Sequence, residues 1–365
     1  MRKDSPRIAV FGATGLVGRE ILAILASRRF PLGNLRVLAS SRSQGTSLEF
    51  SGRHLPVEDV ASADLRGIDL AFLATSSSMS LDLAPRLLDA GAAVIDSSSA
   101  FRHEPDVPLV IPEINGELLD DAPRLVSSPN CSTSIALMAV DPIRRAAGIR
   151  RMTVCTYQAV SGAGAAAVAE LEQQARDFSA GRPIEPRHFP SPCLFNLFPH
   201  ESPIDPDGEN QEEAKIRAES RKIWSDPTLA VAATCVRVPT RRAHAEAINL
   251  TLERSLSVAE ARSLVATAPG VRLFDLEPGS RGPEPRDAEG RDEVLVGRIR
   301  ADLSQPSGRG LWIFVVADQI RKGASLNAVQ IAERLVGASA WRSSDPALTP
   351  SQSVAFASGP RPGDR

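Results

Sequence analysis

The chain has few cysteines, few aromatic residues and almost no excess charge, and each shortage argues against a class of protein. Four cysteines occur among 365 residues, with no CxxC pair. This usage indicates neither a disulfide framework nor a metal site, and it is typical of a reducing cytoplasm. Aromatic residues make up 4%, too few for a surface that stacks nucleic-acid bases. The formal net charge of −2 gives no reason to expect a nucleic acid or an acidic membrane as partner.

Long apolar segments are missing as well. No run reaches the roughly 18 apolar residues of a membrane span, and the charged residues 1–7 lack the apolar region of a signal peptide. We therefore expect a soluble, cytoplasmic protein with no membrane partner. A hydrophobic fraction of 42% allows sizeable cores, and 365 residues suggest two domains.

Short apolar strands alternate with helical patterns through the first third of the chain. The expected strands cover 8–11, 35–39, 70–74 and 93–96, with helical spacing after 16 and over 81–90. This order predicts an α/β domain with a Rossmann-type, doubly wound parallel sheet. We assign it residues 1–132, joined by a C-terminal helix at about 325–338. Residues 339–365, rich in Ser, Pro and Ala, are predicted to be a disordered tail.

The pattern changes after residue 132. Strands are expected over 151–158, 230–237, 245–253, 293–299 and 311–318, with helices over 165–178 and 212–224. Residues 133–324 are thus predicted to form a second, α+β domain with a mixed, largely antiparallel sheet. The segment 277–292, rich in Gly, Pro and charge, is expected to be a mobile excursion.

A glycine-rich turn joins the first expected strand to the first helix. It has the sequence GATGLVG at 12–18, with the spacing GxxGxxG in place of the commoner GxGxxG. Glycines permit a tight turn and let the backbone approach a pyrophosphate at a helix N-terminus. Its place in the first βα unit favours a nucleotide over an ordinary strand-to-helix turn. The expected cofactor contacts are Gly12, Thr14, Gly15, Leu16, Val17 and Gly18.

The end of the second strand favours NADP as the cofactor. An NAD site usually carries an acidic residue there for the ribose hydroxyls, but this chain has Ser-Ser-Arg-Ser at 40–43. An arginine flanked by hydroxyls suits a 2′-phosphate, through charge-assisted hydrogen bonds. We expect contacts from Ser40, Arg42 and Ser43; a solvated loop arginine is the alternative.

Cys131 stands where a helical apolar run begins, within SPNCST at 128–133. A helix N-terminus offers free N–H groups and partial positive charge, which favour the reactive thiolate. Cys131 is therefore a candidate nucleophile, although many free cysteines are only small buried hydrophobes. Of five histidines, His244 alone lies in a charged, strand-flanked segment. It is the candidate proton shuttle, against a structural or surface role.

Seven segments resemble the aspartate-semialdehyde dehydrogenase family in order and spacing, over almost all of residues 7–337. They are GATGLVG at 12–18, SSSAFR at 97–102, PNCST at 129–133, TYQAVSGAG at 156–164, EEAK at 212–215, RVPxxxxH at 237–244 and KGASLNAVQIAE at 322–333. One such motif is a weak signal, but seven in the family's order make a specific resemblance.

The resemblance implies roles for individual residues. Cys131 would be the acylated nucleophile, Gln158 would orient the reacting acyl group or water, and His244 would be the acid/base. Arg237 would bind the substrate α-carboxylate and Glu212 its α-ammonium. The phosphate would be held by Arg102, Asn130 and Lys215, and the nicotinamide end of NADP would contact Ser161, Gly162 and Gln319.

The implied reaction is the NADPH-dependent reductive dephosphorylation of 4-phospho-L-aspartate to L-aspartate 4-semialdehyde through a cysteine thioester. In the family this step serves lysine, methionine, threonine and diaminopimelate synthesis. The resemblance also implies a homodimer or homotetramer, with the second domain as catalytic and dimerisation domain.

The chain departs from the family pattern at two places. Gln319 replaces the usual Asn, and the acidic, proline-containing loop 202–211 leaves open whether Glu213 shares the role of Glu212.

Two alternatives remain at the level of sequence. An N-acetyl-glutamyl-phosphate reductase would share fold and mechanism but accept an acylated amine, which an acidic residue aimed at a free ammonium disfavours. A non-catalytic relative would be expected to lose the nucleophile, whereas Cys131, Gln158, Arg237 and His244 are all present.

Overall fold

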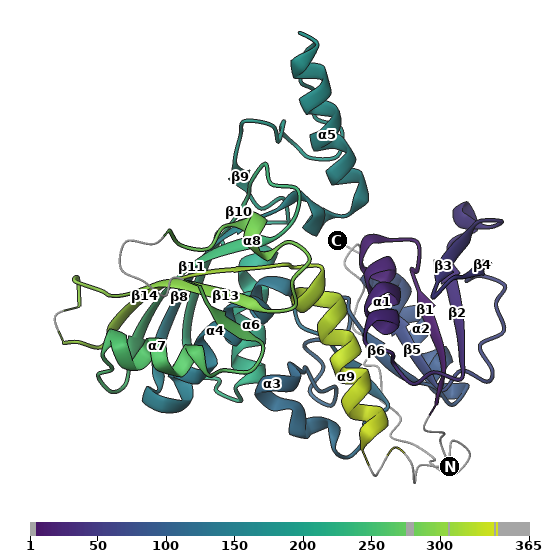
Figure 1. Ribbon diagram of the computed structural model, residues 1–365, viewed down its shortest axis with the longest axis horizontal. Helices are drawn as coiled ribbons and strands as arrows, with labels where there is room; N and C mark the ends of the chain where they lie inside the picture. The colour runs from purple at the N-terminus through teal and green to yellow at the C-terminus, as the bar shows by residue number, and fades with distance from the viewer. Residues whose placement is uncertain (1–4, 275–280, 306, 339–340, 342–365) are drawn as a thin grey trace.

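The computed structural model describes residues 5–274, 281–305, 307–338 and 341. Figure 1 shows two sheets with their helices, the first formed by the N-terminal part of the chain, and α9 (Leu326–Gly337) lying between them. Within the described residues, no helix is both long and apolar enough to cross a membrane.

The first sheet is a doubly wound one in the order β3-β4-β2-β1-β5-β6-β7. Every neighbouring pair is parallel except β3 and β4, which form an antiparallel hairpin at one edge. The strand order reverses at β1, which creates the switch point where such sheets bind ligands. The strands are β1 (Arg7–Phe11), β2 (Asn34–Ala39), β3 (Ser47–Phe50), β4 (Arg53–Asp59), β5 (Leu70–Leu73), β6 (Ala93–Asp96) and β7 (Leu125–Ser127).

Helices cover both faces of this sheet, because alternate residues of each strand point to opposite sides. Ile8 and Val10 pack with α1 (Leu16–Ser27) and α9, whereas Ala9 and Phe11 pack with α2 (Ser77–Asp89). The C-terminal helix therefore lies in the first domain. Trp341 joins the same core with 1% exposure; the rest of the tail expected from residue 339 lies outside the described residues. Short turns at the edge are η1 (Ser41–Ser43), α3 (Pro112–Asn115) and η2 (Gly116–Leu119).

The second sheet has the order β12-β13-β14-β11-β8-β10-β9. The pairs β8–β10 and β12–β13 are parallel and the other neighbours antiparallel. The predicted fold class, a Rossmann-type domain followed by an α+β domain with a mixed sheet, is thus confirmed. The strands are β8 (Ile149–Gln158), β9 (Phe198–Pro199), β10 (Ala230–Arg237), β11 (His244–Leu252), β12 (Val271–Leu273), β13 (Val294–Ala301) and β14 (Gly310–Ala317).

One face of the second sheet packs against α4 (Cys131–Ala147), whose apolar side meets Val154, Ile248 and Val315. Because α4 begins at Cys131, its N-terminus stands where the two domains join, and α5 projects away from the body (Figure 1). The remaining elements are η3 (Val160–Ala163), α5 (Ala165–Ser179), α6 (Gln211–Ile223), α7 (Val258–Ala266), α8 (Pro285–Ala288) and η4 (Arg321–Ser325).

Several elements were not expected from the sequence. The hairpin β3–β4 is a partly exposed edge with mixed polarity, and β7 has three residues, so neither gives a clear strand pattern. Helix α7 does carry a signal, the capping box formed by Ser257 and Glu260. Of the expected mobile segment 277–292, residues 277–280 lie outside the described residues; the remainder contains α8, whose Ala288 is fully buried.

Candidate active site

The N-terminus of α4 places Cys131 at a cavity between the two domains. Asn130 caps the helix, since its Oδ1 accepts hydrogen bonds from the N–H groups of Ser132 at 2.9 Å and Thr133 at 3.2 Å. The cavity has a volume of about 310 Å³. The predicted site residues that line it are Val17, Arg102, Asn130, Cys131, Gln158, Ser161, Gly162, Glu212, Lys215, Arg237 and Gln319. Lining residues not singled out from the sequence include Ser97, Ser99, His200, Glu201 and Gly323.

Three predicted residues form a row across the second sheet. Arg237 on β10 stands opposite Gln158 on β8, and the antiparallel register of β8 and β11 sets His244 beside Gln158. Directly opposed residues share a face of a sheet, and this face carries the N-terminus of α4. Strand register thus brings together residues that lie up to 86 positions apart in the sequence.

Gln158 presents an acceptor to the cavity. Its Nε2 donates to Oγ of Ser132 at 3.0 Å and to Oε1 of Glu212 at 3.2 Å. Both amide hydrogens are therefore used, and the carbonyl oxygen Oε1 is the group left for a ligand. This geometry favours orientation of a donor, such as a thiol, an ammonium or a water, over stabilisation of an oxyanion.

His244 is completely buried behind the cavity wall. Its Nδ1 accepts the N–H of Ala159 at 3.0 Å, so the neutral ring carries its hydrogen on Nε2. Burial, helped by the charge of Arg237, lowers the pKa of His244 to about 3. Nε2 has no hydrogen-bond partner in the described part of the chain. A Cβ on Gly162, which lines the cavity, would lie 3.2 Å from it. Only glycine leaves this approach open.

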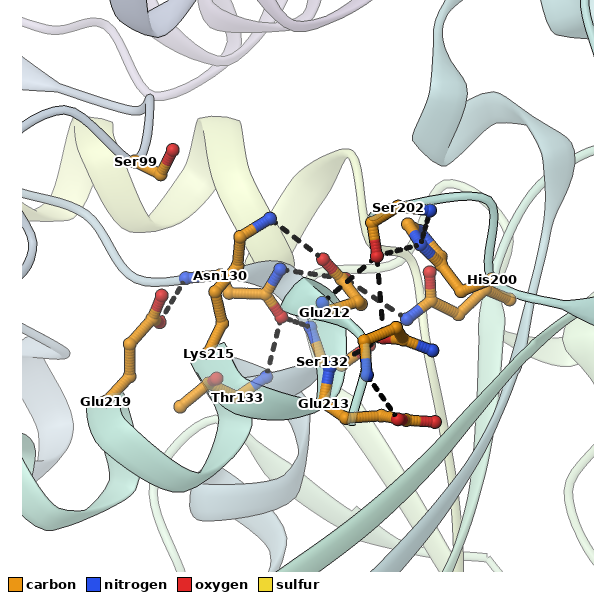
Figure 2. Close-up of polar contacts among 12 residues, drawn as sticks. Ser99, Asn130, Ser132, Thr133, His200, Ser202, Glu212, Glu213, Lys215 and Glu219 are labelled. Carbon is orange, nitrogen blue, oxygen red and sulfur yellow. Dashed lines mark hydrogen bonds and ion pairs between the residues drawn. The ribbon is translucent and has the colours of Figure 1, made fainter. Parts of the chain in front are cut away.

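The carboxylate of Glu212 accepts from Lys215 and Asn130, which Figure 2 labels beside it, and also from Gln158. Nζ of Lys215 is 3.1 Å from Oε2, and Nδ2 of Asn130 donates to Oε1 at 2.9 Å. Burial works against its charge, but Lys215 and the hydrogen bond from Asn130 help to hold the pKa of Glu212 at about 2. Glu213 instead forms the capping box of α6 with Asn210 and accepts from N–H of Cys235. This contact set favours Glu212 over Glu213 as the ammonium site.

Arg102 lines the cavity with part of its charge already matched. It pairs with Glu219 at 3.0 Å and donates to the carbonyl oxygens of Ser128 and Ser97. Two of its five N–H groups remain for a ligand. Oδ1 of Asn130 accepts from Ser132 and Thr133, and Nδ2 donates one of its two hydrogens to Glu212, which leaves the second amide hydrogen for the expected contact with phosphate.

The environment of Cys131 opposes the thiolate when no ligand is bound. Burial, with the negative charge of Glu212, raises the pKa of the Cys131 thiol to about 12, although Arg102 and Arg237 act in the opposite direction. The helix N-terminus, from which we expected a stabilised anion, is therefore outweighed.

Gly323 packs directly against Cys131. A Cβ on Gly323 would lie 2.8 Å from the Cβ of Cys131, closer than real Cβ contacts allow. The glycine belongs to η4, the irregular turn before α9, within the KGASLN segment. The sequence marks that segment but gives no reason for its glycine, because the contact joins residues 192 positions apart.

A buried carboxyl group, that of Glu246, lies on β11 two residues after His244. Glu246, opposite Thr156 in the register, is 0% exposed, and neither carboxyl oxygen has a hydrogen-bond partner of normal geometry among the described residues. Burial raises its pKa well above the ordinary value, with the hydroxyl of Ser132 only partly offsetting this. Burial therefore favours the protonated form of Glu246. The sequence shows it only as one residue of a strand.

The glycine turn at 12–18 has the close contacts that a dinucleotide site needs. Gly12 has φ +74, and a Cβ there would lie 2.1 Å from the carbonyl oxygen of Ala74. A Cβ on Gly18 would lie 2.3 Å from the carbonyl oxygen of Gly12. Both positions therefore require glycine, and they hold the N-terminus of α1 at the switch point of the sheet.

Cofactor residues are linked across this region. Oγ1 of Thr14 lies 3.2 Å from Oγ of Ser43, so the glycine turn contacts the loop that carries the exposed Arg42. Gln319 bridges the domains' junction, since its Oε1 accepts N–H of Ala243 at 2.8 Å and its Nε2 donates to Ser161. The side-chain amide of Gln319, longer than that of the usual Asn, thus already bonds other residues of the chain.

In the described ranges, no group of three His, Cys, Asp or Glu side chains could hold a metal ion.

Comparisons with known proteins agree with this geometry. Residues 7–122 match the family model described as semialdehyde dehydrogenase, NAD binding domain, and residues 140–322 match semialdehyde dehydrogenase, dimerisation domain. The aspartate-semialdehyde dehydrogenase of Synechocystis is 47% identical, with 90% of this chain and 97% of the relative covered. That of Aquifex aeolicus is 45% identical, with 90% and 98% covered.

Solved structures give the same answer. The crystal structure of aspartate semialdehyde dehydrogenase II complexed with ASA from Vibrio cholerae is similar with a TM-score of 0.88 and 40% identity, covering 91% of this chain and 98% of that one. The enzyme with NADP from Candida albicans, 22% identical with a TM-score of 0.70, shares the fold. The chain belongs to the aspartate-semialdehyde dehydrogenase family.

Proposed function

We propose that this oxidoreductase catalyses the reductive dephosphorylation of 4-phospho-L-aspartate to L-aspartate 4-semialdehyde through a thioester on Cys131. The observation that carries the proposal is the position of Cys131, at a helix N-terminus and at a cavity that Gln158, Glu212 and Arg237 also line. The substrate is a small zwitterion with an acyl phosphate, and the cavity offers fixed charges of both signs for its groups.

Each charged group of the substrate has a matching side chain. Arg237 would bind the α-carboxylate through a bidentate fork and Glu212 the α-ammonium. Lys215 and the two remaining N–H groups of Arg102 would hold the phosphate. An ammonium beside Glu212 would also neutralise the negative charge that helps to raise the pKa of Cys131.

The covalent steps then follow from the chain's own groups. Sγ of Cys131 attacks the acyl carbon, the bond from that carbon to the phosphate oxygen breaks, and the thiol proton leaves with the departing phosphate as hydrogen phosphate. Gln158, through its free Oε1, would orient a hydrogen-bond donor of the reacting complex, such as the thiol. NADPH, when bound, supplies the hydride that reduces the thioester. The resulting thiohemiacetal releases the aldehyde and restores Cys131, with Nε2–H of His244 placed to stabilise negative charge on the oxygen.

The glycine turn and the loop 40–43 support NADP as the cofactor. The tight contacts of Gly12 and Gly18 fit a pyrophosphate at the N-terminus of α1, with Thr14, Gly15, Leu16 and Val17 completing the turn. Arg42, with Ser40 and Ser43, would hold the 2′-phosphate. Val17, Ser161, Gly162 and Gln319 line the cavity beside Cys131 and would surround the nicotinamide.

The Arg42→Ala variant tests this cofactor assignment. Loss of one charge-assisted hydrogen bond at an exposed position should raise the KM for NADP about tenfold and leave the KM for NAD nearly unchanged. Steady-state kinetics with both cofactors measures the effect, and Arg53→Ala, another exposed arginine of the same domain, is the control. An equal rise for both cofactors would mean that Arg42 does not contact the 2′-phosphate.

The assembly and location are also part of the proposal. The match of residues 140–322 to a dimerisation domain supports a homodimer or homotetramer formed by the second domain. A cytoplasmic location suits an enzyme that depends on a reduced thiol at Cys131.

A coupled assay tests the proposed function directly. The purified protein should reduce NADP in the presence of phosphate and L-aspartate 4-semialdehyde, and should be inactive with N-acetyl-L-glutamate 5-semialdehyde. The second substrate carries an acylated amine, which cannot donate to Glu212 as an ammonium does. Activity with the acetylated substrate alone would assign the chain to the other reductase, and activity with neither would support a non-catalytic role.

A further inference from the structure

Arg237, the proposed anchor of the substrate carboxylate, has an internal partner. Its Nε donates to Oε2 of Glu201 at 3.2 Å and its Nη2 to Oε1 at 2.6 Å, a bidentate fork. Nη1 donates to the carbonyl oxygen of Ala159 at 2.9 Å, and Nη2 also donates to Nε2 of His200 at 2.9 Å. Four of the five N–H groups of the guanidinium are therefore used.

This arrangement leaves no room for a second bidentate acceptor. A substrate carboxylate needs two neighbouring N–H groups, and Arg237 has one that is free. One of the present partners must therefore leave when the substrate binds. The carbonyl of Ala159 belongs to the backbone beside η3, and the imidazole of His200 is held on its other side by Ser202, whose Oγ lies 3.1 Å from Nδ1. The side chain of Glu201 is 24% exposed and can rotate toward solvent without moving the backbone.

Burial and charge support the same exchange. The side chain of Arg237 is 1% exposed and that of Glu201 is 24% exposed. Glu201 therefore has a path to solvent, whereas Arg237 does not. Hydrogen bonds from Arg237 lower the pKa of Glu201 although burial opposes this, so the residue is a carboxylate at neutral pH. Exchange of one carboxylate for another keeps the buried guanidinium paired, whereas an unpaired charge there would be costly.

The surrounding segment keeps Glu201 in reach of the site. N–H of His200 donates to the carbonyl of Cys235 on β10. Oγ of Ser202 accepts N–H of Glu212 at 3.2 Å, and Figure 2 shows Ser202 beside His200 at the end of α6. The backbone on both sides of Glu201 is thus attached to the strand and helix that carry the substrate anchors. This segment opens the acidic loop at 202–211 for which the sequence offered no role.

We propose that Glu201 occupies the position of the substrate α-carboxylate on Arg237 and is displaced by it, which makes Glu201 a determinant of substrate affinity and of selectivity for carboxylate-bearing aldehydes. The inference rests on the proposed function, in which Arg237 binds that carboxylate. A ligand with a carboxylate replaces Glu201 on the guanidinium. A ligand without one leaves the pair intact and gains nothing from Arg237.

Glu201→Gln tests the proposal through an increase in affinity. The amide keeps the size of the side chain but forms a weaker pair with Arg237, so the KM for L-aspartate 4-semialdehyde should fall about tenfold and kcat should change much less. For 3-aminopropanal, the same aldehyde without the carboxylate, kcat/KM should not change. Glu209→Gln, which alters an acid of the same loop that pairs with Arg217, is the matched control and should leave both KM values unchanged.

The outcomes separate the inference from the proposed function. A KM that rises or stays constant in Glu201→Gln, or an equal gain for 3-aminopropanal, overturns the role of Glu201 while the wild type remains active. A wild type that reduces NADP with neither semialdehyde overturns both. If melting curves show that Glu201→Gln does not fold, Glu201→Asp replaces it. Its shorter side chain should lower the KM about threefold, and no decrease counts against the proposal.

Discussion

Replacement of Cys131 by alanine is expected to abolish phosphate-dependent reduction of NADP, with a loss in kcat on the order of 10⁴-fold or more. The variant removes the only atom that can form the thioester, and the cavity keeps its other residues. Its effect on folding should be small, because the thiol contributes little packing at a helix start where Asn130 provides the cap. The assay follows the reduction of NADP by its change in absorbance.

Cys155→Ala is the matched control. Cys155 lies on β8, close in sequence to Gln158, but does not line the cavity. It should keep wild-type kinetics. Mass spectrometry of the enzyme with acyl phosphate but no reduced cofactor should detect an acyl adduct on Cys131, which the alanine variant lacks. Equal turnover of Cys131→Ala and the wild type would show that this cysteine is not the nucleophile.

The elements that the sequence predicts well are those whose pattern is local. The fully buried strands β5 and β6 appear as apolar runs, and α9 shows helical spacing with a glycine at its end. The glycines of the cofactor turn are predictable for the same reason. Gly12 and Gly18 approach backbone atoms of the βα unit and of the adjacent β5 end, and this packing is common to such turns.

The polar partners of the site residues could not be predicted in this way. The acids that hold Arg237 and Arg102 are Glu201 and Glu219, and each pair depends on how separate elements pack. The pKa of Glu246 is raised because the packing of the sheet and α4 buries its side chain. Gly323 is required only because η4 approaches Cys131. Sequence motifs mark where such residues lie but not which contacts they make.

The protonation states are the clearest example. From sequence, a cysteine at a helix N-terminus indicates a stabilised thiolate and a nearby histidine indicates a base. In the folded chain, burial acts on both groups and favours their neutral forms. Desolvation depends on the whole environment, and its effect here exceeds that of the helix terminus.

His244→Asn is expected to lower kcat about 10²–10³-fold, because under the proposed function it removes the N–H donor that would stabilise the reacting oxygen. Because Nδ1 of His244 accepts the N–H of Ala159, the ring hydrogen is on Nε2. That nitrogen has no hydrogen-bond partner in the described structure. His244→Gln should retain more activity, with a loss of about tenfold, since its Nε2 can reach the same place. His54→Asn, at an exposed position on β4, is the control.

The pH dependence distinguishes a hydrogen-bond donor from a base. The pKa of His244 is lowered to about 3, so the ring is neutral throughout the range from pH 5 to pH 8. If the wild-type profile of kcat/KM against pH falls at low pH, the His244 variants should show the same fall, because His244 does not titrate in this range. If instead the variants lose that fall, and His244→Gln is as inactive as His244→Asn, the histidine must accept a proton. Nδ1 would then have to release the N–H of Ala159 during turnover, a rearrangement that the buried position of the ring makes slow.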